Sequence, residues 1–201
     1  MKSKLLLVSF ILSVQLSYAQ GYKIGDVVGN FNLKGTDGKM HSLPTGNEIK
    51  GAIVVFTSNH CPFSIAYEDR IIALHKKYAS MGYPVIAINP NDEVKQPEDS
   101  YRFMKKKSKK KNFPFHYLHD ENQETAKLFG ATRTPHVFIT SKNINGEHVL
   151  MYIGAIDNNT DNPEVADKKY VEMAVEELRI GKDVSVPNTK AIGCSIKWKA
   201  K

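Results

Sequence analysis

The sequence predicts an α/β protein with a mixed central sheet flanked by helices. Two apolar, β-branched runs, at residues 53–57 and 84–88, are separated by a segment with helical periodicity. Continuous apolar runs are typical of strands buried on both faces, and the order strand, helix, strand predicts a parallel βαβ unit. Two later runs, at 136–140 and 149–156, flank a turn signal and predict an antiparallel pair, which makes the sheet mixed.

Residues 1–19 have the pattern of a secretory signal peptide. Two lysines in the first four residues precede an apolar stretch at 5–14, and Ser17-Tyr18-Ala19 offers small residues before Gln20. The apolar stretch is shorter than the ~18 residues of a membrane span. We therefore expect a signal peptide at 1–19, one domain at 20–201, and a periplasmic or secreted protein without a membrane span.

The chain is basic, but its charge is concentrated in one place. Its 201 residues carry a formal net charge of +7, and six lysines lie between residues 105 and 111. A charged run is typical of a solvated helix end, and this one lacks the interleaved aromatic side chains of a nucleic-acid surface. We expect no nucleic-acid partner.

The N-terminal half predicts a hairpin and two helices beside the βαβ strands. Residues 31–43 alternate around the turn signal Thr36-Asp37-Gly38-Lys39, which predicts an N-terminal β-hairpin extension. A helix is predicted from Pro62 to about Met81, because apolar side chains recur at helical spacing: Ile65, Ile71, Ile72, Leu74 and Tyr78. Residues 97–111 are polar and weakly helical, which predicts a surface helix.

The C-terminal half predicts one minor strand and two further helices. Residues 113–118 are short, aromatic and interrupted by proline, which predicts an edge or minor strand. Residues 121–129 predict a short helix that ends at Gly130 and offers the core Ala126, Leu128 and Phe129. Residues 167–180 predict a final amphipathic helix, and the tail after it is irregular.

Cys61 is the predicted nucleophile. It lies directly before Pro62, between a buried strand and a helix, and proline is well tolerated in a first helical turn. A sulfur at a helix N-terminus faces unpaired N–H groups and the positive end of the helix dipole, which favours the thiolate. The alternative is a buried, unreactive cysteine.

Cys194 is the only other cysteine. It is predicted to be the resolving thiol if the chain contains one, since a sulfenic acid at Cys61 can condense with it. A permanent structural disulfide is a serious alternative in an oxidising compartment. A third alternative is an unpaired tail thiol beneath Trp198.

Two features together resemble the thioredoxin fold: Cys61 at a helix start, and Thr134-Pro135 opening a later strand. The resemblance implies a cis-proline at Pro135 packed against the cysteine, and a Thr134 backbone that pairs with substrate near the sulfur. The N-terminal segment 25–43 resembles the alkyl hydroperoxide reductase/thiol-specific antioxidant family. Asn59-His60-Cys61-Pro62 and residues 193–198 resemble a bacterial redoxin subgroup of exported, thioredoxin-like or peroxiredoxin-like proteins.

The chain departs from both family patterns. Thioredoxins have a second cysteine where this chain has Ser64, so local resolution is impossible. Peroxiredoxins have a threonine or serine where this chain has Ser58, but they have a proline where it has Val54. Their peroxide-binding arginine falls at about Pro135, and Arg133 is close to it in the sequence.

The remaining candidate residues surround Cys61. Ser58 and Ser64 can donate hydrogen bonds to a thiolate or a peroxide oxygen. Ser64 is equally well explained as an ordinary helix residue. His60 either lowers the pKa of Cys61 or lies on the surface, and we favour the surface. The candidate catalytic residues are Cys61, Cys194, Ser58 and Ser64, and the candidate substrate-binding residues are Thr134, Pro135, His60 and Pro62.

The leading hypothesis is an exported thiol–disulfide oxidoreductase that acts on protein disulfides and is recycled by an external thiol. The alternative is a thiol peroxidase, an antioxidant that reduces hydroperoxides through a Cys61 sulfenic acid. A third hypothesis, from another class, is a redox-inactive binding domain or a copper carrier that uses Cys61 with His60 and His136. We expect no cofactor and no metal, and the sequence leaves the oligomeric state open.

Overall fold

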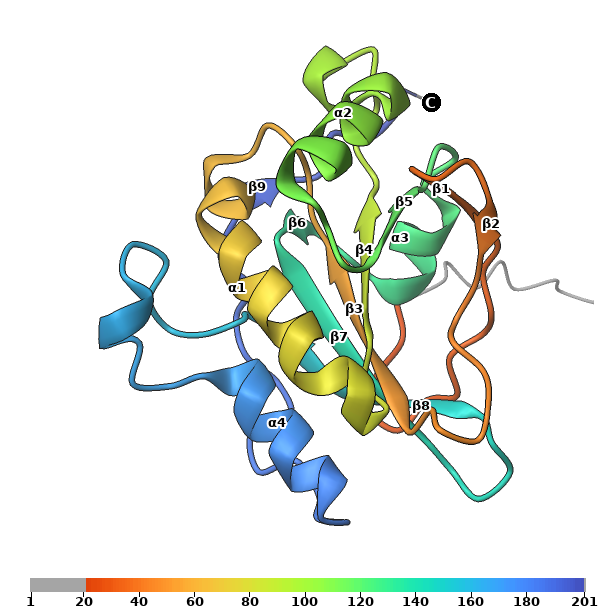
Figure 1. Cartoon of the computed structure of the whole chain (residues 1–201), viewed down its shortest axis with the longest axis vertical. Helices are drawn as coiled ribbons and strands as arrows, with labels where there is room; N and C mark the ends of the chain where they lie inside the picture. The colour runs from red at the N-terminus through yellow and green to blue at the C-terminus, as the bar shows by residue number, and fades with distance from the viewer. Residues whose placement is uncertain (1–20, 201) are drawn as a thin grey trace, which may run out of the picture.

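A mixed seven-stranded sheet forms the centre of the protein, whose computed structural model describes residues 21–200 (Figure 1). The predicted signal peptide lies outside the described residues. The strand order across the sheet is β2-β1-β5-β4-β3-β7-β8. The strands are β1 (Leu33–Gly35), β2 (Met40–His41), β3 (Gly51–Phe56), β4 (Val85–Asn89), β5 (His116–His119), β7 (His136–Lys142) and β8 (His148–Gly154).

The predicted βαβ unit is confirmed. Strand β3 pairs in parallel with β4, with Ile53 opposite Val85, and both strands are buried along their whole length. Helix α1 (Pro62–Tyr78) and the short 3-10 helix η1 (Ala79–Met81) connect them. Gly82 ends the connection with a left-handed φ of 90°, a conformation that glycine adopts without steric cost. Strands β7 and β8 add the expected antiparallel pair beside β3.

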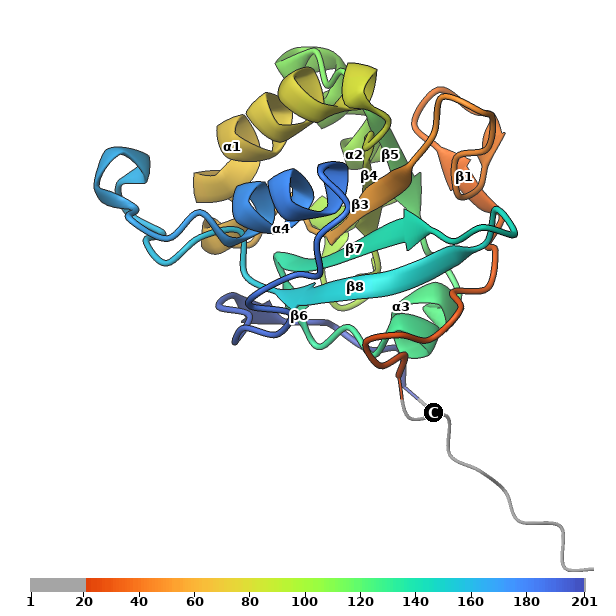
Figure 2. The same ribbon diagram turned by 90° about the horizontal axis from the view of Figure 1, so that it is seen from below.

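Helices cover both faces of the sheet. Figure 2 shows α1 and α4 (Tyr170–Arg179) on one face and α3 (Glu124–Phe129) on the other. Side chains alternate along each strand, so β3 contributes Ile53 and Val55 to the α1 face and Val54 and Phe56 to the α3 face. Two apolar layers therefore hold β3 in place just before the residues that lead to Cys61.

Residues 113–118 are predicted to form an edge or minor strand; β5 is short, with four residues, but it is not an edge strand. The hairpin β1–β2 forms as predicted, with Leu33 opposite His41, but β1 also pairs with β5. Strand β5 therefore lies between β1 and β4. Pro114, which suggested an edge position, precedes the strand and removes no hydrogen bond from it.

The remaining helices follow the prediction with local differences. Helix α2 (Tyr101–Lys111), preceded by η2 (Pro97–Asp99), is a surface helix that buries only Met104. Two apolar side chains of the predicted helices lie outside the core, contrary to expectation: Leu128 is 47% exposed and Ile65 is 49% exposed. Helix α4 begins at Tyr170 rather than at residue 167, after the short helix η3 (Pro163–Val165).

The C-terminal tail is more ordered than expected. Strand β9 (Cys194–Ser195) pairs antiparallel with β6 (Arg133–Thr134), and the two form a small second sheet. This pairing places the tail beside the loop that carries Cys61. Within residues 21–200, no helix is both long and apolar enough to cross a membrane.

Candidate active site

Cys61 occupies the N-cap position of α1, at the helix start where the sequence predicts it. The chain leaves β3 at Phe56, crosses a short loop, and enters the helix at Pro62. The first turn of α1 holds no acidic residue, so no side chain there opposes a negative charge on the sulfur. Cys61 is only 1% exposed, because the tail lies across it.

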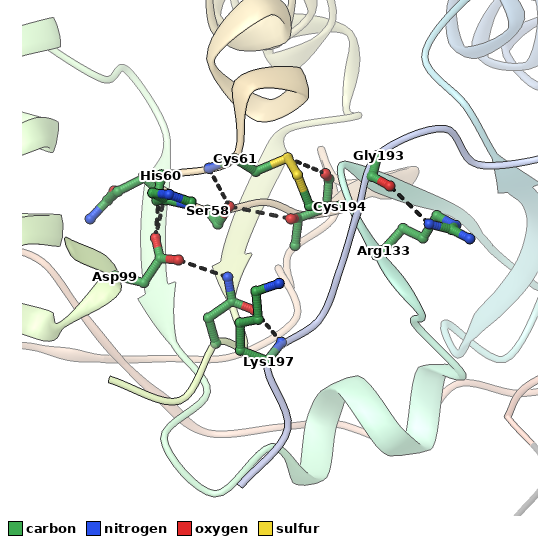
Figure 3. The surroundings of a disulfide bond; sticks show 11 residues. Ser58, His60, Cys61, Asp99, Arg133, Gly193, Cys194 and Lys197 are labelled. Atoms are coloured by element: carbon green, nitrogen blue, oxygen red, sulfur yellow. Dashed lines mark hydrogen bonds between the residues drawn. A yellow bond between two sulfur atoms is a disulfide. The ribbon is translucent and has the colours of Figure 1, made fainter. Parts of the chain in front are cut away.

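The two cysteines are joined by a disulfide (Figure 3). Their Cα atoms are 6.0 Å apart, although 133 positions separate them in the sequence. The β6–β9 pairing explains the approach, because it sets Cys194 opposite Thr134. The disulfide is incompatible with an unpaired tail thiol beneath Trp198. Cys194 is partly exposed, whereas Cys61 is buried.

The Thr134–Pro135 peptide bond is cis, as expected. Thr134 is fully buried, and its carbonyl oxygen lies 3.0 Å from the Cys61 sulfur. A disulfide sulfur has no proton, so this oxygen can accept a hydrogen bond only from the reduced thiol. The backbone of Thr134 therefore faces both cysteines.

The structure joins Ser58 to the site by hydrogen bonds, but not Ser64. Ser58 is buried, its Oγ accepts from the Cys61 N–H at 3.4 Å, and it lies 3.2 Å from the Thr134 hydroxyl. Ser64 is also fully buried, but its Oγ has no hydrogen-bond partner among the described residues. Position 64 thus supplies no hydrogen bond to the disulfide.

Two polar residues near Cys61 point elsewhere. His60 has an exposed side chain, as favoured from the sequence, and only its backbone N–H bonds inward. Arg133 donates from Nη1 to the carbonyl oxygen of Gly193 at 2.9 Å, so it holds the tail and does not face a substrate at Cys61 (Figure 3). Pro62 is exposed at the start of α1.

Asp99 is a site residue that the sequence did not reveal. It is fully buried, and its Oδ1 accepts from the backbone N–H of Asn59 at 2.5 Å and of His60 at 3.3 Å. Its Oδ2 accepts from the Asn91 amide at 2.7 Å, and Asn91 in turn accepts from the Lys197 N–H at 2.8 Å. This path, which we call the Asp99 network, links the Cys61 loop to the tail (Figure 3).

A second set of contacts holds the tail beyond Cys194. Gln123 donates to the carbonyl oxygen of Lys197 at 2.8 Å and accepts from the Lys199 N–H at 2.7 Å. The Asp92 N–H also donates to the Lys197 carbonyl at 2.9 Å. In the sequence, the polar run 89–92 has only the composition of a turn, and it does not indicate these contacts with the tail.

Lysines of α2 help to hold the loop before Cys61. Lys107 forms an ion pair with the buried Glu68 of α1 and donates to the Asn59 carbonyl at 2.9 Å. Lys111 pairs with the same carboxylate at 3.1 Å. The lysine run is therefore not wholly a solvated helix end, because two of its members neutralise a buried charge.

His136 follows the cis-proline and is buried without charge. Burial, together with the nearby Arg133, lowers its pKa to about 4. Its Nδ1 accepts from the Thr132 N–H at 3.4 Å. Because His136 is neutral, the start of β7 carries no buried positive charge next to Pro135.

Comparisons with known proteins agree with this geometry. The model of the AhpC/TSA family matches residues 24–148. An uncharacterized conserved protein from Geobacillus kaustophilus is 31% identical with a TM-score of 0.80, over 89% of this chain and 94% of its own. A hypothetical protein from Sinorhizobium meliloti is 30% identical with a TM-score of 0.80, over 90% of this chain and 98% of its own.

A more distant match supports the fold alone. Peroxidoxin BcpB from Mycobacterium tuberculosis is 18% identical with a TM-score of 0.54, over 69% of this chain and 89% of its own. No curated protein matches the chain. Together with the mixed sheet, the cysteine at a helix start and the cis-proline, these matches establish a thioredoxin-like redoxin fold.

Proposed function

Because the chain belongs to the AhpC/TSA family of thioredoxin-like redoxins, we propose that it is an exported thiol–disulfide oxidoreductase. In this proposal Cys61 is the nucleophile and Cys194 is the resolving cysteine. The observation that carries it is the disulfide between a helix-capping cysteine and a partly exposed tail cysteine.

The reduced protein would act in two exchange steps. The Cys61 thiolate attacks one sulfur of a substrate disulfide, forms a mixed disulfide and releases the other substrate sulfur as a thiolate. The deprotonated Cys194 then attacks the Cys61 sulfur, releases the second substrate thiolate and closes the Cys61–Cys194 disulfide. Two electrons pass from the cysteine pair to the substrate, which leaves as a dithiol after taking up two protons.

The pairing of β9 with β6 supports a peptide-like substrate. The tail lies along the Thr134 backbone with Cys194 opposite that residue, as an extended peptide would when it adds a strand to an exposed edge. A substrate peptide and the tail would therefore compete for one backbone edge. The tail must leave this edge in the reduced form before a protein disulfide reaches Cys61.

Recycling by an external thiol would begin at Cys194. Its sulfur belongs to a partly exposed residue, whereas Cys61 is 1% exposed. Attack at Cys194 makes Cys61 the leaving group, and a leaving thiolate at a helix N-terminus is stabilised by the helix dipole. The mixed disulfide then forms between the reductant and Cys194, and a second reductant thiol releases it.

A second candidate is a thiol peroxidase. The AhpC/TSA match and the buried Ser58 beside Cys61 favour it. Here the Cys61 thiolate attacks a peroxide oxygen, the alcohol or water leaves, and Cys194 condenses with the sulfenic acid to release water. Against it, the Arg133 guanidinium bonds to the tail rather than facing the sulfur.

The two candidates are separated by the rate at which reduced protein loses its thiols. Fully reduced protein is mixed with one equivalent of a peptide disulfide or of hydrogen peroxide, and the products are read by intact mass. We expect fast exchange with the peptide disulfide and loss to peroxide at the rate of an ordinary thiol. The opposite ranking would establish the peroxidase, and a Cys61–Cys194 bond that resists excess dithiol would contradict both.

A further inference from the structure

A second cluster of chemically active side chains lies at the far edge of the sheet, outside the disulfide site. It consists of Asp37, His41 and His116. Asp37 lies in the β1–β2 turn, His41 ends β2, and His116 begins β5, with which β1 pairs. The hairpin and β5 thus contribute two segments that are distant in sequence to one group of ligand atoms.

The geometry of the cluster matches a cation site. One donor atom from each residue lies within 4.8 Å of the others. The His41 and His116 rings are stacked with centroids 3.8 Å apart, and His41 Nε2 lies 2.9 Å from Asp37 Oδ2. Ligands of a tetrahedral zinc ion lie about 3.3 Å apart, so small side-chain rotations would bring the three atoms to bonding distance.

The surroundings leave the donors accessible. Asp37 and His116 are exposed, and all three residues line a groove of about 610 Å³. The His116 ring makes no hydrogen bond to the described part of the chain, so a metal would not have to displace a protein partner there. His41 and Asp37 would exchange their mutual contact for bonds to the ion.

We propose that Asp37, His41 and His116 form a binding site for a divalent transition metal ion, with Zn²⁺ as the reference ligand. Two imidazoles and one carboxylate are the donor set that suits Zn²⁺, whereas Mg²⁺ and Ca²⁺ prefer oxygen ligands alone. Three protein ligands leave a fourth position facing the groove for water or a small ligand. The ion would join the hairpin to β5 independently of the redox state of the cysteines.

The test measures Zn²⁺ binding to the untagged oxidised protein, in which the closed disulfide keeps both thiols from binding the metal. Titration against a chromophoric chelator should give one Zn²⁺ per chain and none for Mg²⁺. The variants His116→Ala and Asp37→Asn should bind at least about tenfold more weakly, the scale at which even outer ligand-shell changes act. Saturating Zn²⁺ should also raise the Tm of the wild type but not that of His116→Ala.

The matched control is His60→Ala, which removes an exposed histidine outside the groove. It should bind Zn²⁺ like the wild type. Absence of binding to the wild type would overturn the proposal, as would equal affinities for wild type and His116→Ala. A loss of affinity in His60→Ala but not in His116→Ala would place the metal at the disulfide loop instead.

Discussion

The two halves of the disulfide are held in very different ways. Cys61 lies between a strand that is buried along its whole length and a seventeen-residue helix, and it is 1% exposed. Cys194 lies in a two-residue strand at the end of the chain and is partly exposed. The core thus fixes one sulfur, while hydrogen bonds and the burial of Ile196, two residues further along, hold the other.

Because of this contrast, the two sulfurs differ in how far they can move. The Cys61 sulfur cannot move far without disturbing packed strands, since protein interiors are close-packed. To leave its edge, the tail must break the β6–β9 pairing and the contacts to Asn91, Asp92 and Gln123. It must also expose Ile196, which is buried against the core. A fixed nucleophile and a movable partner are what a two-cysteine exchange cycle requires.

The largest expected effect separates the two cysteines themselves. Cys61→Ser should abolish exchange with a peptide disulfide, because it removes the nucleophile. Cys194→Ser should still react once and then accumulate a mixed disulfide at Cys61, since the resolving thiol is gone. Intact mass after one equivalent of substrate tests this, and an adduct on Cys61→Ser would reverse the assigned roles.

The Asp99 network should be the next most sensitive point. Asp99→Asn keeps the shape but replaces one acceptor oxygen by a donor, so either a backbone N–H or the Asn91 amide loses its partner. A buried unsatisfied group costs about 1–3 kcal/mol. Urea unfolding of the oxidised protein should show that loss, and the equilibrium with glutathione should shift toward the reduced form.

Glu98→Gln is the control for this variant. Glu98 lies in the same short helix as Asp99, but its side chain is exposed, so the free energy of unfolding of this variant should differ from that of the wild type by less than about 0.5 kcal/mol. Equal losses in Asp99→Asn and Glu98→Gln would mean that the network does not hold the loop.

Buried His136 should make the stability of the folded protein sensitive to acid. Its folded pKa of about 4 lies below the unfolded value, so the unfolded chain takes up the proton first as the pH falls. The contribution of neutral His136 to the free energy of unfolding is fully present above about pH 6.5 and is lost as the pH falls toward 4. By pH 5 the loss is about 2 kcal/mol. Urea unfolding of the wild type and of His136→Gln at pH 7.5 and 5 should show a smaller acid loss in the variant. Parallel losses would contradict a neutral buried His136.

The smallest effect is expected from the tail edge itself. A Cβ at Gly193 would overlap the Thr134 carbonyl, so Gly193→Ala should push β9 away from β6. We expect the equilibrium constant for forming the Cys61–Cys194 disulfide in a glutathione buffer to fall roughly fivefold, or about 1 kcal/mol. The free energy of unfolding of the reduced protein should change little. Ser195→Ala, an exposed position of the same strand, should match the wild type.

Local patterns were enough to predict the fixed half of the site. The strand before Cys61, the helix after Pro62, and Thr134-Pro135 are each contiguous in the sequence, and the structure contains all of them. The fold class followed from these segments, and the family resemblance rested also on residues 25–43 and 193–198; the comparisons confirm both.

The movable half was not predictable because it depends on pairings between distant segments. The position of Cys194 is set by β6, and the role of Asp99 depends on Asn59 and Asn91, which lie on separate loops. The misplacement of β5 had the same cause, since only the hairpin strand β1 covers its edge. Ser64 stands where thioredoxins have their second cysteine, yet the helix buries it without a hydrogen-bond partner among the described residues.

The Cys61–Cys194 bond also closes a very long covalent loop. It joins residues 133 positions apart, so the cross-link encloses four of the seven strands of the main sheet, β4, β5, β7 and β8. In the chain-entropy account, a loop of this length restricts the unfolded ensemble by about 5 kcal/mol. Reduction removes that restriction and so lowers the free energy of unfolding. The reduced protein should therefore be cleaved by proteases faster than the oxidised protein.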